Sequence, residues 1–166
     1  TPTDSSAASD VYKRQPYLGI CFGAQLLAKC LGSEITTNKD GLSEIGFYKI
    51  EPTENAKNLF NSQKIFFQFH SEGFSLPTGC ELLARGDIFN NQAFKYQNCY
   101  ALQFHPEVNF KLHMRWLYLV LLKNPKKLFV KGAQNIFVQL YYRYKYNKNI
   151  SNWLDSFLDQ YFLKKI

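Results

Sequence analysis

The chain begins with 15 mostly polar residues in which no hydrophobic period is visible. From residue 17 the pattern becomes regular. An apolar run at 17–20 predicts a β-strand, and apolar residues with alanines at 24–31 predict a helix. Gly32 stands where glycine commonly ends a helix. The chain therefore enters its fold through a strand, a tight connection and a helix.

Further strands are predicted where short apolar or alternating segments lie between turn residues. These segments are residues 34–36, 45–50, 65–69, 82–84, 93–96 and 100–104. The last two are joined through Gln97-Asn98 and predict a hairpin. Residues 71–73, which follow the apolar segment 65–69, are expected to form a loop.

Beyond Pro106 the hydrophobic period becomes helical, which predicts helices at residues 110–123, 128–146 and 150–163. Strands that alternate with helices, without an internal repeat or a low-complexity linker, indicate an α/β fold. A length of 166 residues suits one domain with a single core. We therefore expect one domain over residues 16–166.

Residues 1–15 are left out of this interpretation. Their sequence, TPTDSSAASDVYKRQ, resembles an adaptor-derived artefact of translated transcript assemblies, and the alternative is a genuine disordered tail. Residue 1 is Thr and the only Met is Met114, while the fold pattern starts abruptly at Pro16. We expect a non-native or disordered leader and an upstream segment that this chain lacks.

Composition excludes several classes of protein. Hydrophobic residues make up 46% and aromatic residues 17%, so disorder is not expected. No apolar run reaches the roughly 20 residues of a membrane span, so no membrane association is expected. The four cysteines, at positions 21, 30, 80 and 99, contain no C-x-x-C pair. We expect free thiols in a reducing cytoplasm, with no metal site and no cofactor.

The net charge of +7 is distributed unevenly. Residues 111–166 hold 11 Lys and Arg against 2 Asp, a net charge of +9, whereas residues 16–110 carry a net charge of −2. The basic excess therefore lies away from the motifs described below. Solvated helix faces are the favoured explanation, a polyanion-binding surface is the alternative, and nucleic acid is not the expected partner.

A first candidate for chemistry is Gly19-x-Cys21-x-Gly23, which closes the first strand and opens the first helix. It is the thiol counterpart of the G-x-S-x-G turn, where a strained corner projects the nucleophile from the sheet. The helix N-terminus favours thiolate, and the amide of Phe22 would point at an oxyanion. A structural cysteine between two turn glycines is the alternative.

A second candidate lies at the end of the predicted strand 100–104, where His105-Pro106-Glu107 follows. Residues two apart in an extended segment point to the same side. Glu107 would then accept a hydrogen bond from one nitrogen of His105 and leave the other free to take the proton of Cys21. This pattern predicts a nucleophile, a base and a residue that orients the base.

Two other histidines are possible rivals for the role of base. His113 lies in a predicted helix between Lys111 and Arg115, so we expect it on the surface. His70 ends a predicted strand and is the second candidate. His105 is preferred.

These motifs together resemble the signature of class I glutamine amidotransferases. Residues 16–25, PYLGICFGAQ, resemble the family's P-x-x-G-I-C-x-G-x-Q, and residues 103–108, QFHPEV, are similar to its second motif. Cys21 and His105 stand 84 positions apart. The resemblance covers about residues 16–166 and is nearest to stand-alone domains related to the GMP synthase amidotransferase. Further similar segments are Glu44-Ile45-Gly46, Phe69-His70-Ser71-Glu72, Leu76-Pro77-x-Gly79, Asn91-Gln92-Ala93-Phe94, Gly132-Ala133-Gln134 and Asn152-Trp153-Leu154.

The resemblance implies a flavodoxin-like fold, here without its N-terminal strands and with extra C-terminal helices. It implies hydrolysis of the glutamine side-chain amide through a γ-glutamyl thioester on Cys21, with His105 and Glu107 completing the triad. Gln25 is implied to contact glutamine, and the loop at Ser71 and Glu72 to hold its α-carboxylate and amine. The ammonia would go to an acceptor on a synthetase partner.

One departure from the family pattern bears on activity. The family takes a second oxyanion amide from an upstream glycine loop, whereas Gly19 is the only glycine before Cys21. We therefore expect this chain to be impaired, by about 10²–10³ in rate for one lost donor. Two other functions stay open: a γ-glutamyl peptidase with the same chemistry, and a non-catalytic interaction module of the same fold.

Overall fold

In the computed structural model, which describes residues 16–60 and 62–163, the strands form three sheets. The largest has the order β1-β9-β8-β7-β4. Its strands are β1 (Tyr17–Ile20), β4 (Glu51–Pro52), β7 (Glu81–Arg85), β8 (Ala93–Tyr96) and β9 (Cys99–Leu102). Strand β1 is parallel to β9 and the other neighbours are antiparallel. The predicted leader, residues 1–15, lies outside the described residues.

Two smaller antiparallel sheets complete the strands. Strand β3 (Glu44–Lys49) pairs with β5 (Ile65–His70), and β2 (Ile35–Thr37) pairs with β6 (Glu72–Phe74). The prediction of a loop over residues 71–73 is wrong from Glu72 onwards. A three-residue strand has too few positions to show alternation, and its pairing with β2 is a tertiary contact. The predicted hairpin is confirmed by β8 and β9.

The helices are α2 (Phe22–Cys30), α3 (Phe110–Lys123) and α4 (Ile136–Leu158), with short turns η1 (Glu54–Ala56), η2 (Pro125–Phe129) and the π-helical η3 (Asp159–Leu163). The prediction of two separate helices at 128–146 and 150–163 is wrong, because one helix, α4, spans most of both segments. Gly132 has φ 93°, and the side chain of Asn135 caps α4 by accepting from the amide of Phe137. Helix α4 therefore begins at Ile136 and continues without a break through 147–149.

Buried residues on one face explain why α4 stays continuous. They are Gln139, Arg143, Ile150, Trp153 and Phe157, at spacings of three, four and seven that keep them on one side of a helix. Polar residues such as Lys148 lie on the exposed side, so they do not interrupt the helix.

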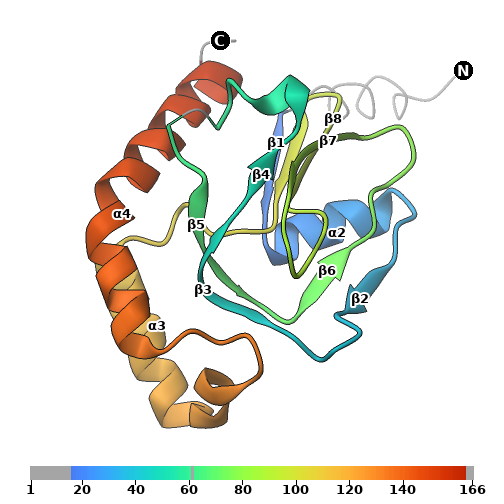
Figure 1. Cartoon of the computed structure of the whole chain (residues 1–166). Coiled ribbons are helices and arrows are strands. Elements are labelled where there is room, and N and C mark those ends of the chain that lie inside the picture. The colour runs from blue at the N-terminus through green and yellow to red at the C-terminus, as the bar shows by residue number, and fades with distance from the viewer. Residues whose placement is uncertain (1–15, 61, 164–166) are drawn as a thin grey trace, which may run out of the picture.

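Two hydrophobic clusters lie on opposite faces of β9, because side chains alternate along a strand. Tyr100 and Leu102 belong to a large cluster that α4 covers, and Ala101 belongs to a smaller one. Ala24 and Ala28, one turn apart on α2, pack into the smaller cluster. Figure 1 shows the resulting arrangement, with α3 and α4 along one side of the strands and α2 on the other.

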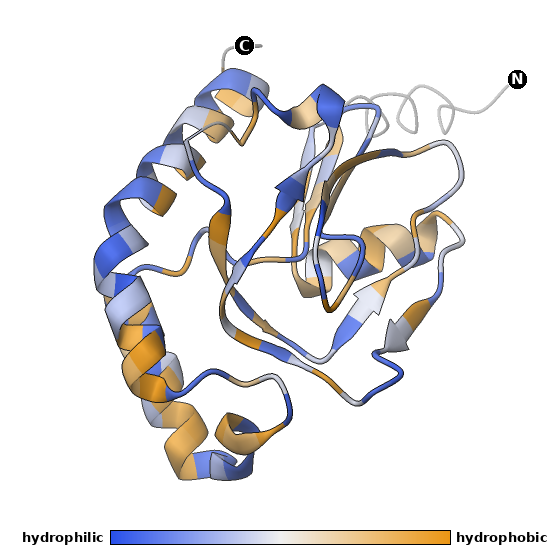
Figure 2. Cartoon of the chain, in the orientation of Figure 1, coloured by the Kyte–Doolittle hydropathy of each residue, from blue (hydrophilic) through white to orange (hydrophobic). Residues whose placement is uncertain are grey.

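Hydropathy differs along the C-terminal helices. Figure 2 shows mostly hydrophilic residues along the middle of α4 and hydrophobic residues at its N-terminal end and along α3. Among residues 16–60 and 62–163, no helix combines the length and hydrophobicity that a membrane crossing requires.

Candidate active site

Cys21 stands at the corner between β1 and α2 with a backbone that non-glycine residues rarely adopt, φ 48° and ψ −104°. Its amide donates to the carbonyl of Leu102 at 2.7 Å, which fastens the corner to β9. A Cβ on Gly19 would lie 2.7 Å from the backbone of Gly23, so β1 and α2 meet too closely for any other residue there. The corner thus presents a half-buried sulfur at the end of the sheet.

His105 follows β9 and is held on three sides. Its amide donates to the carbonyl of Phe67 at 2.8 Å, and its Nδ1 lies 2.7 Å from Oε1 of Glu107. Its ring meets that of Trp116 edge-on, with 5.1 Å between the centroids. The imidazole is therefore buried and fixed in orientation, as the two-residue spacing to Glu107 predicts.

The charge state of His105 follows from its neighbours. Burial disfavours the imidazolium and is the largest single influence on its pKa. Hydrogen bonds with Cys21 and Glu107, together with their negative charges, outweigh that influence and raise the pKa to about 9. At neutral pH the ring is charged and lies between the sulfur and the carboxylate. Such a ring can supply a proton to one side while its other side stays paired.

Phe22 and Gln25 lie in the first turn of α2. The first amide that bonds within the helix is that of Gln25, which donates to the carbonyl of Cys21 at 3.0 Å. The amide of Phe22 precedes it and has no acceptor within the helix. The Gln25 side chain donates to the backbone carbonyl of Glu72 at 2.9 Å, so it links the corner to the start of β6.

Gln103 is the first residue of the second motif, 103–108, and the sequence predicts no role for it. Its side chain is fully buried, and its Nε2 lies 3.7 Å from the sulfur of Cys21. Its Oε1 lies 3.5 Å from Nε2 of Gln25. The signal for it was its place in the predicted strand 100–104, two residues before His105, where a buried amide needs polar partners.

Ser71 and Glu72 are exposed, and Glu72 faces the site through its backbone carbonyl. Ser71 lines a cavity of about 320 Å³ with Lys126 and Lys127. Lys127 also lies over the ring of Phe69, 4.4 Å from its centroid. A pair of cations thus lies beside the turn that was predicted to hold substrate.

The other two histidines take structural partners. His113 is fully buried, so the prediction that it lies on the surface is wrong. Burial and the nearby charge of Arg143 lower the pKa of His113 to about 4, and its ring lies 4.4 Å from that of Phe67. The flanking Lys111 and Arg115 are exposed. Residues two apart in a helix can lie on its exposed and its buried face, so these charges did not indicate where His113 lies. His70, although followed by Glu72 at the same spacing, pairs with Glu44 at 2.9 Å.

No group of three or more potential metal ligands exists among the His, Cys, Asp and Glu side chains of the part that the structure describes. All four cysteines carry free thiols. Of these, Cys21 is the one at the strand–helix corner beside a histidine.

Comparison with protein families gives one match that covers most of the chain. The model described as "Glutamine amidotransferase class-I" matches residues 2–124. The chain belongs to this family. Helix α4 follows the matched residues.

Known amidotransferases resemble this chain in sequence and structure. A glutamine-hydrolysing GMP synthase subunit of Methanobrevibacter smithii is 31% identical over 97 residues, which cover 57% of this chain and 51% of that protein. The protein of the same name from Pyrococcus furiosus is 35% identical over 101 residues, 59% of this chain and 54% of its own length. The chain spans about half the length of these relatives.

A crystal structure of a glutamine amidotransferase from Thermotoga maritima superimposes with a TM-score of 0.78 and 28% identity, covering 93% of this chain and 66% of that one. A glutamine amidotransferase from Methylobacillus flagellatus has the same fold, with a TM-score of 0.75 and 24% identity over 88% of this chain and 61% of that one. The expected flavodoxin-like α/β fold of the class I amidotransferases is confirmed.

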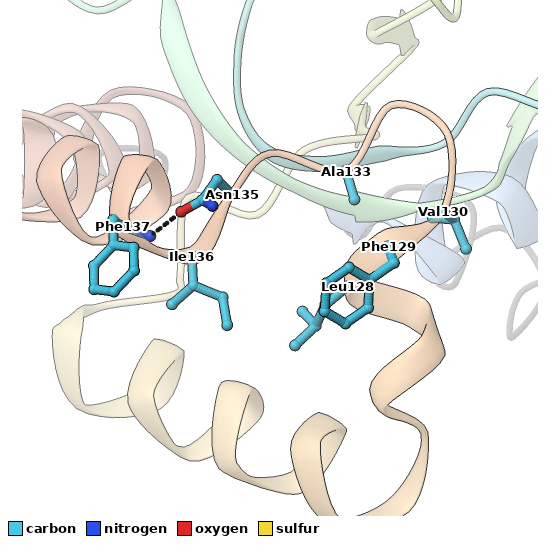
Figure 3. A pocket seen from close by; sticks show the side chains of 7 residues that line it. All are labelled: Leu128, Phe129, Val130, Ala133, Asn135, Ile136 and Phe137. Atoms are coloured by element: carbon cyan, nitrogen blue, oxygen red, sulfur yellow. Dashed lines mark hydrogen bonds between the residues drawn. The ribbon is translucent and has the colours of Figure 1, made fainter.

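A larger, apolar cavity of the amidotransferase chain lies apart from these side chains. It measures about 430 Å³ and lies between η2 and the start of α4. Figure 3 shows side chains from both segments around it. The lining residues are Leu128, Phe129, Val130, Ala133, Asn135, Ile136 and Phe137. It contains no residue that the sequence singled out for chemistry.

Proposed function

We propose that this protein hydrolyses the side-chain amide of glutamine, with Cys21 as nucleophile, His105 as its acid and base, and Glu107 as the residue that orients His105. One observation carries the proposal: the buried His105 ring, whose Nδ1 is bonded to Glu107 and whose pKa is raised to about 9 despite burial by partners that include Cys21.

The reaction would proceed in two halves. In the first, the Cys21 sulfur, its proton held by Nε2 of His105, attacks the amide carbon, and the amide of Phe22 donates to the oxyanion. The C–N bond then breaks as His105 gives its proton to the leaving nitrogen, which departs as ammonia. A γ-glutamyl thioester on Cys21 remains.

In the second half, His105 takes a proton from water and the resulting hydroxyl attacks the thioester carbon. The C–S bond breaks, glutamate leaves, and the thiolate–imidazolium pair of Cys21 and His105 is restored. Glutamine and water are consumed, and glutamate and ammonia are produced. No cofactor is needed, since every proton passes through His105.

For substrate binding we propose Gln25 and the backbone at Ser71 and Glu72. The support is the hydrogen bond that ties Gln25 to the Glu72 carbonyl, next to Gln103 and the sulfur. Because the relatives are named as one subunit of GMP synthase, we propose that a separate synthetase protein receives the ammonia. We propose the cytoplasm as the location, because free thiols suit a reducing compartment.

The test is glutamine hydrolysis by the chain and by two cysteine variants. Cys21→Ser is expected to lower ammonia release by at least about 10³-fold, because the hydroxyl is a much weaker nucleophile. Cys30→Ser is the matched control, an exposed thiol away from the site, and should keep the wild-type rate. Mass spectrometry of quenched wild-type reactions should find a γ-glutamyl adduct on Cys21.

The rate at which a thiol reagent labels each cysteine tests the alternative of a non-catalytic module. Iodoacetamide should label Cys21 faster than Cys30, Cys80 or Cys99. If Cys21 reacts no faster than the other three and no ammonia is released, the chain is better described as an interaction module with an amidotransferase fold.

A second candidate, a γ-glutamyl peptidase, is favoured by the two lysines beside Ser71. A γ-glutamyl dipeptide carries a carboxylate on its leaving group, which Lys126 and Lys127 would attract. Lys127→Gln should then lower kcat/KM for γ-glutamyl dipeptides about fivefold to tenfold and leave glutamine hydrolysis unchanged. Equal effects on both substrates would argue against this function.

A further inference from the structure

Four buried polar side chains form a closed ring of contacts behind the candidate site. Nε2 of His70 lies 2.9 Å from Oε2 of Glu44 and 3.1 Å from Oε1 of Gln68. Gln68 donates to Oε1 of Gln92 at 2.7 Å, and Gln92 donates back to Oε2 of Glu44 at 2.8 Å. Each of the four residues is 5% exposed or less. None of them has a role in the proposed chemistry.

The partners of His70 fix what its ring nitrogens do. Nδ1 lies 2.8 Å from the backbone carbonyl of Glu72, which can only accept a hydrogen bond. Nδ1 therefore carries a proton and donates it. Nε2 faces the Glu44 carboxylate and the amide oxygen of Gln68. The contact with Glu44 therefore holds the ring on the side opposite the Glu72 carbonyl.

The Glu72 carbonyl connects this ring of contacts to the site. It accepts from Nδ1 of His70 and also from Nε2 of Gln25, at 2.9 Å. Gln25 in turn lies beside Gln103, whose amide contacts the sulfur of Cys21. One carbonyl at the start of β6 thus receives a donor from β5 and a donor from α2.

We propose that His70, held by Glu44, is a positioning residue that fixes the β5–β6 turn and through it Gln25 in the arrangement that binds substrate. This rests on the proposed function, since it names a support for the same site. A ring with nitrogens on opposite sides reaches Glu44 and Glu72 at once, which no aliphatic side chain in that core position would do. The requirement for histidine therefore comes from the link to the turn.

Two substitutions distinguish the contact of His70 with Glu72 from its contact with Glu44. In His70→Asn the side-chain amide nitrogen stands near the position of Nδ1 and keeps a donor for Glu72. In His70→Gln it stands near Nε2 and keeps the contact with Glu44 but loses Glu72. Both variants retain a polar side chain in the same core. His70→Asn loses more volume than His70→Gln, so a cavity alone would harm His70→Asn more, the opposite of the order expected here.

Steady-state hydrolysis of glutamine by the full chain is the first measurement. His70→Gln is expected to raise KM about tenfold with kcat changed less than about threefold, the effect of one lost buried hydrogen bond. His70→Asn, the conservative variant, should rescue KM to within about threefold of wild type. Equal KM values for the two variants, or a loss in kcat alone, would overturn the proposal.

Hydrogen exchange supplies a readout that does not depend on activity. Amides of residues 72–75 should lose protection in His70→Gln and keep it in His70→Asn, while α4 amides stay protected in both. If wild type hydrolyses no glutamine yet these amides respond as stated, the proposed function fails and the positioning of the turn stands. If both variants lose protection equally in β6 and α4, His70 only fills the core.

Discussion

The backbone of Cys21 adopts an unfavourable conformation that places its side chain at the candidate site. With φ 48° and ψ −104° it lies where a Cβ is unfavourable, and such strain persists only where the surroundings enforce it. The bond from its amide to Leu102 and the close approach of Gly19 to Gly23 enforce it here. The strain lifts the sulfur clear of the sheet, where the side chain of His105 reaches it.

Removing that strain should stabilise the protein. Cys21→Gly is expected to exceed Cys21→Ala in free energy of unfolding by about 1–2 kcal/mol, since both lose the sulfur and only glycine relaxes at positive φ. Urea denaturation of the two variants measures the difference. A more stable alanine variant would show that the backbone of residue 21 is unstrained.

The raised pKa of His105 makes stability depend on pH in a stated direction. The folded protein holds the proton more tightly than the unfolded chain, whose histidine titrates near 6.5. The contribution is therefore fully present below pH 6.5 and is lost as pH rises toward 9. A rise from 6.5 to about 9 corresponds to about 3–4 kcal/mol.

Glu107→Gln should weaken this dependence. The amide removes a charge that favours the imidazolium, so unfolding free energies at pH 6 and pH 9 should differ less than in wild type. Glu81→Gln, an exposed glutamate on β7, is the control and should keep the wild-type difference. Denaturant titrations at the two pH values decide it; a variant as pH-sensitive as wild type would contradict the link.

Local sequence predicted some of these side chains well and missed others. Glu107 was found because two residues of extended chain suffice to bring it to His105. His113 and Gln103 needed knowledge of packing: the partners of His113 come from β5 and α4, and those of Gln103 from α2. The same limit applies to His70, whose nearest carboxylate in space, Glu44, comes from another strand and is not the one two residues on.

At the scale of elements, the close packing of β1 against α2 depends on Gly19 more than on Gly23. A Cβ on Gly19 would meet backbone atoms of Gly23 at 2.7 Å and of Ala24 at 2.8 Å, and backbone cannot move aside locally. A Cβ on Gly23 would meet only the hydroxyl of Tyr17, at 3.4 Å. The two glycines of the motif are therefore unequal.

Alanine at each position tests that difference. Gly19→Ala should destabilise the fold by about 1–3 kcal/mol through overpacking and slow the alkylation of Cys21. Gly23→Ala should be neutral or stabilising by up to about 1 kcal/mol, because alanine suits a helix better. Urea denaturation and iodoacetamide labelling measure both effects. Similar losses from the two variants would contradict the close approach seen at Gly19.

The elements were predicted best where their own pattern is long. Helix α3 and the β8–β9 hairpin follow from periodicity and turn residues. The start of α4 could not be predicted from periodicity, because the segment before it is apolar but does not belong to the helix. Positive φ at Gly132 and the cap at Asn135 set the boundary. Strand β6 is defined by its partner β2, which lies far away in sequence.

At the scale of the whole molecule, α4 is fastened to the strands by one side chain in particular. Trp153 is 4% exposed, and its indole N–H donates to the carbonyl of Leu59 at 2.8 Å. It stacks on Phe60, with 5.5 Å between centroids, and on Phe157, with 5.1 Å. Residues 59 and 60 lie in the connection between β4 and β5, so one helix holds the chain between two sheets.

The described domain should therefore unfold as one unit, and Trp153→Phe tests this. The variant keeps aromatic packing and loses the hydrogen bond, so the free energy of unfolding should fall by about 1–2 kcal/mol. It leaves Trp116, which packs against His105, as the sole tryptophan. If α4 and the site region share one transition, Trp116 fluorescence and far-UV circular dichroism will give the same midpoint in urea. An earlier loss of helix signal would mean that α4 detaches while the site around His105 stays folded, and the dependence of the site on α4 would then be rejected.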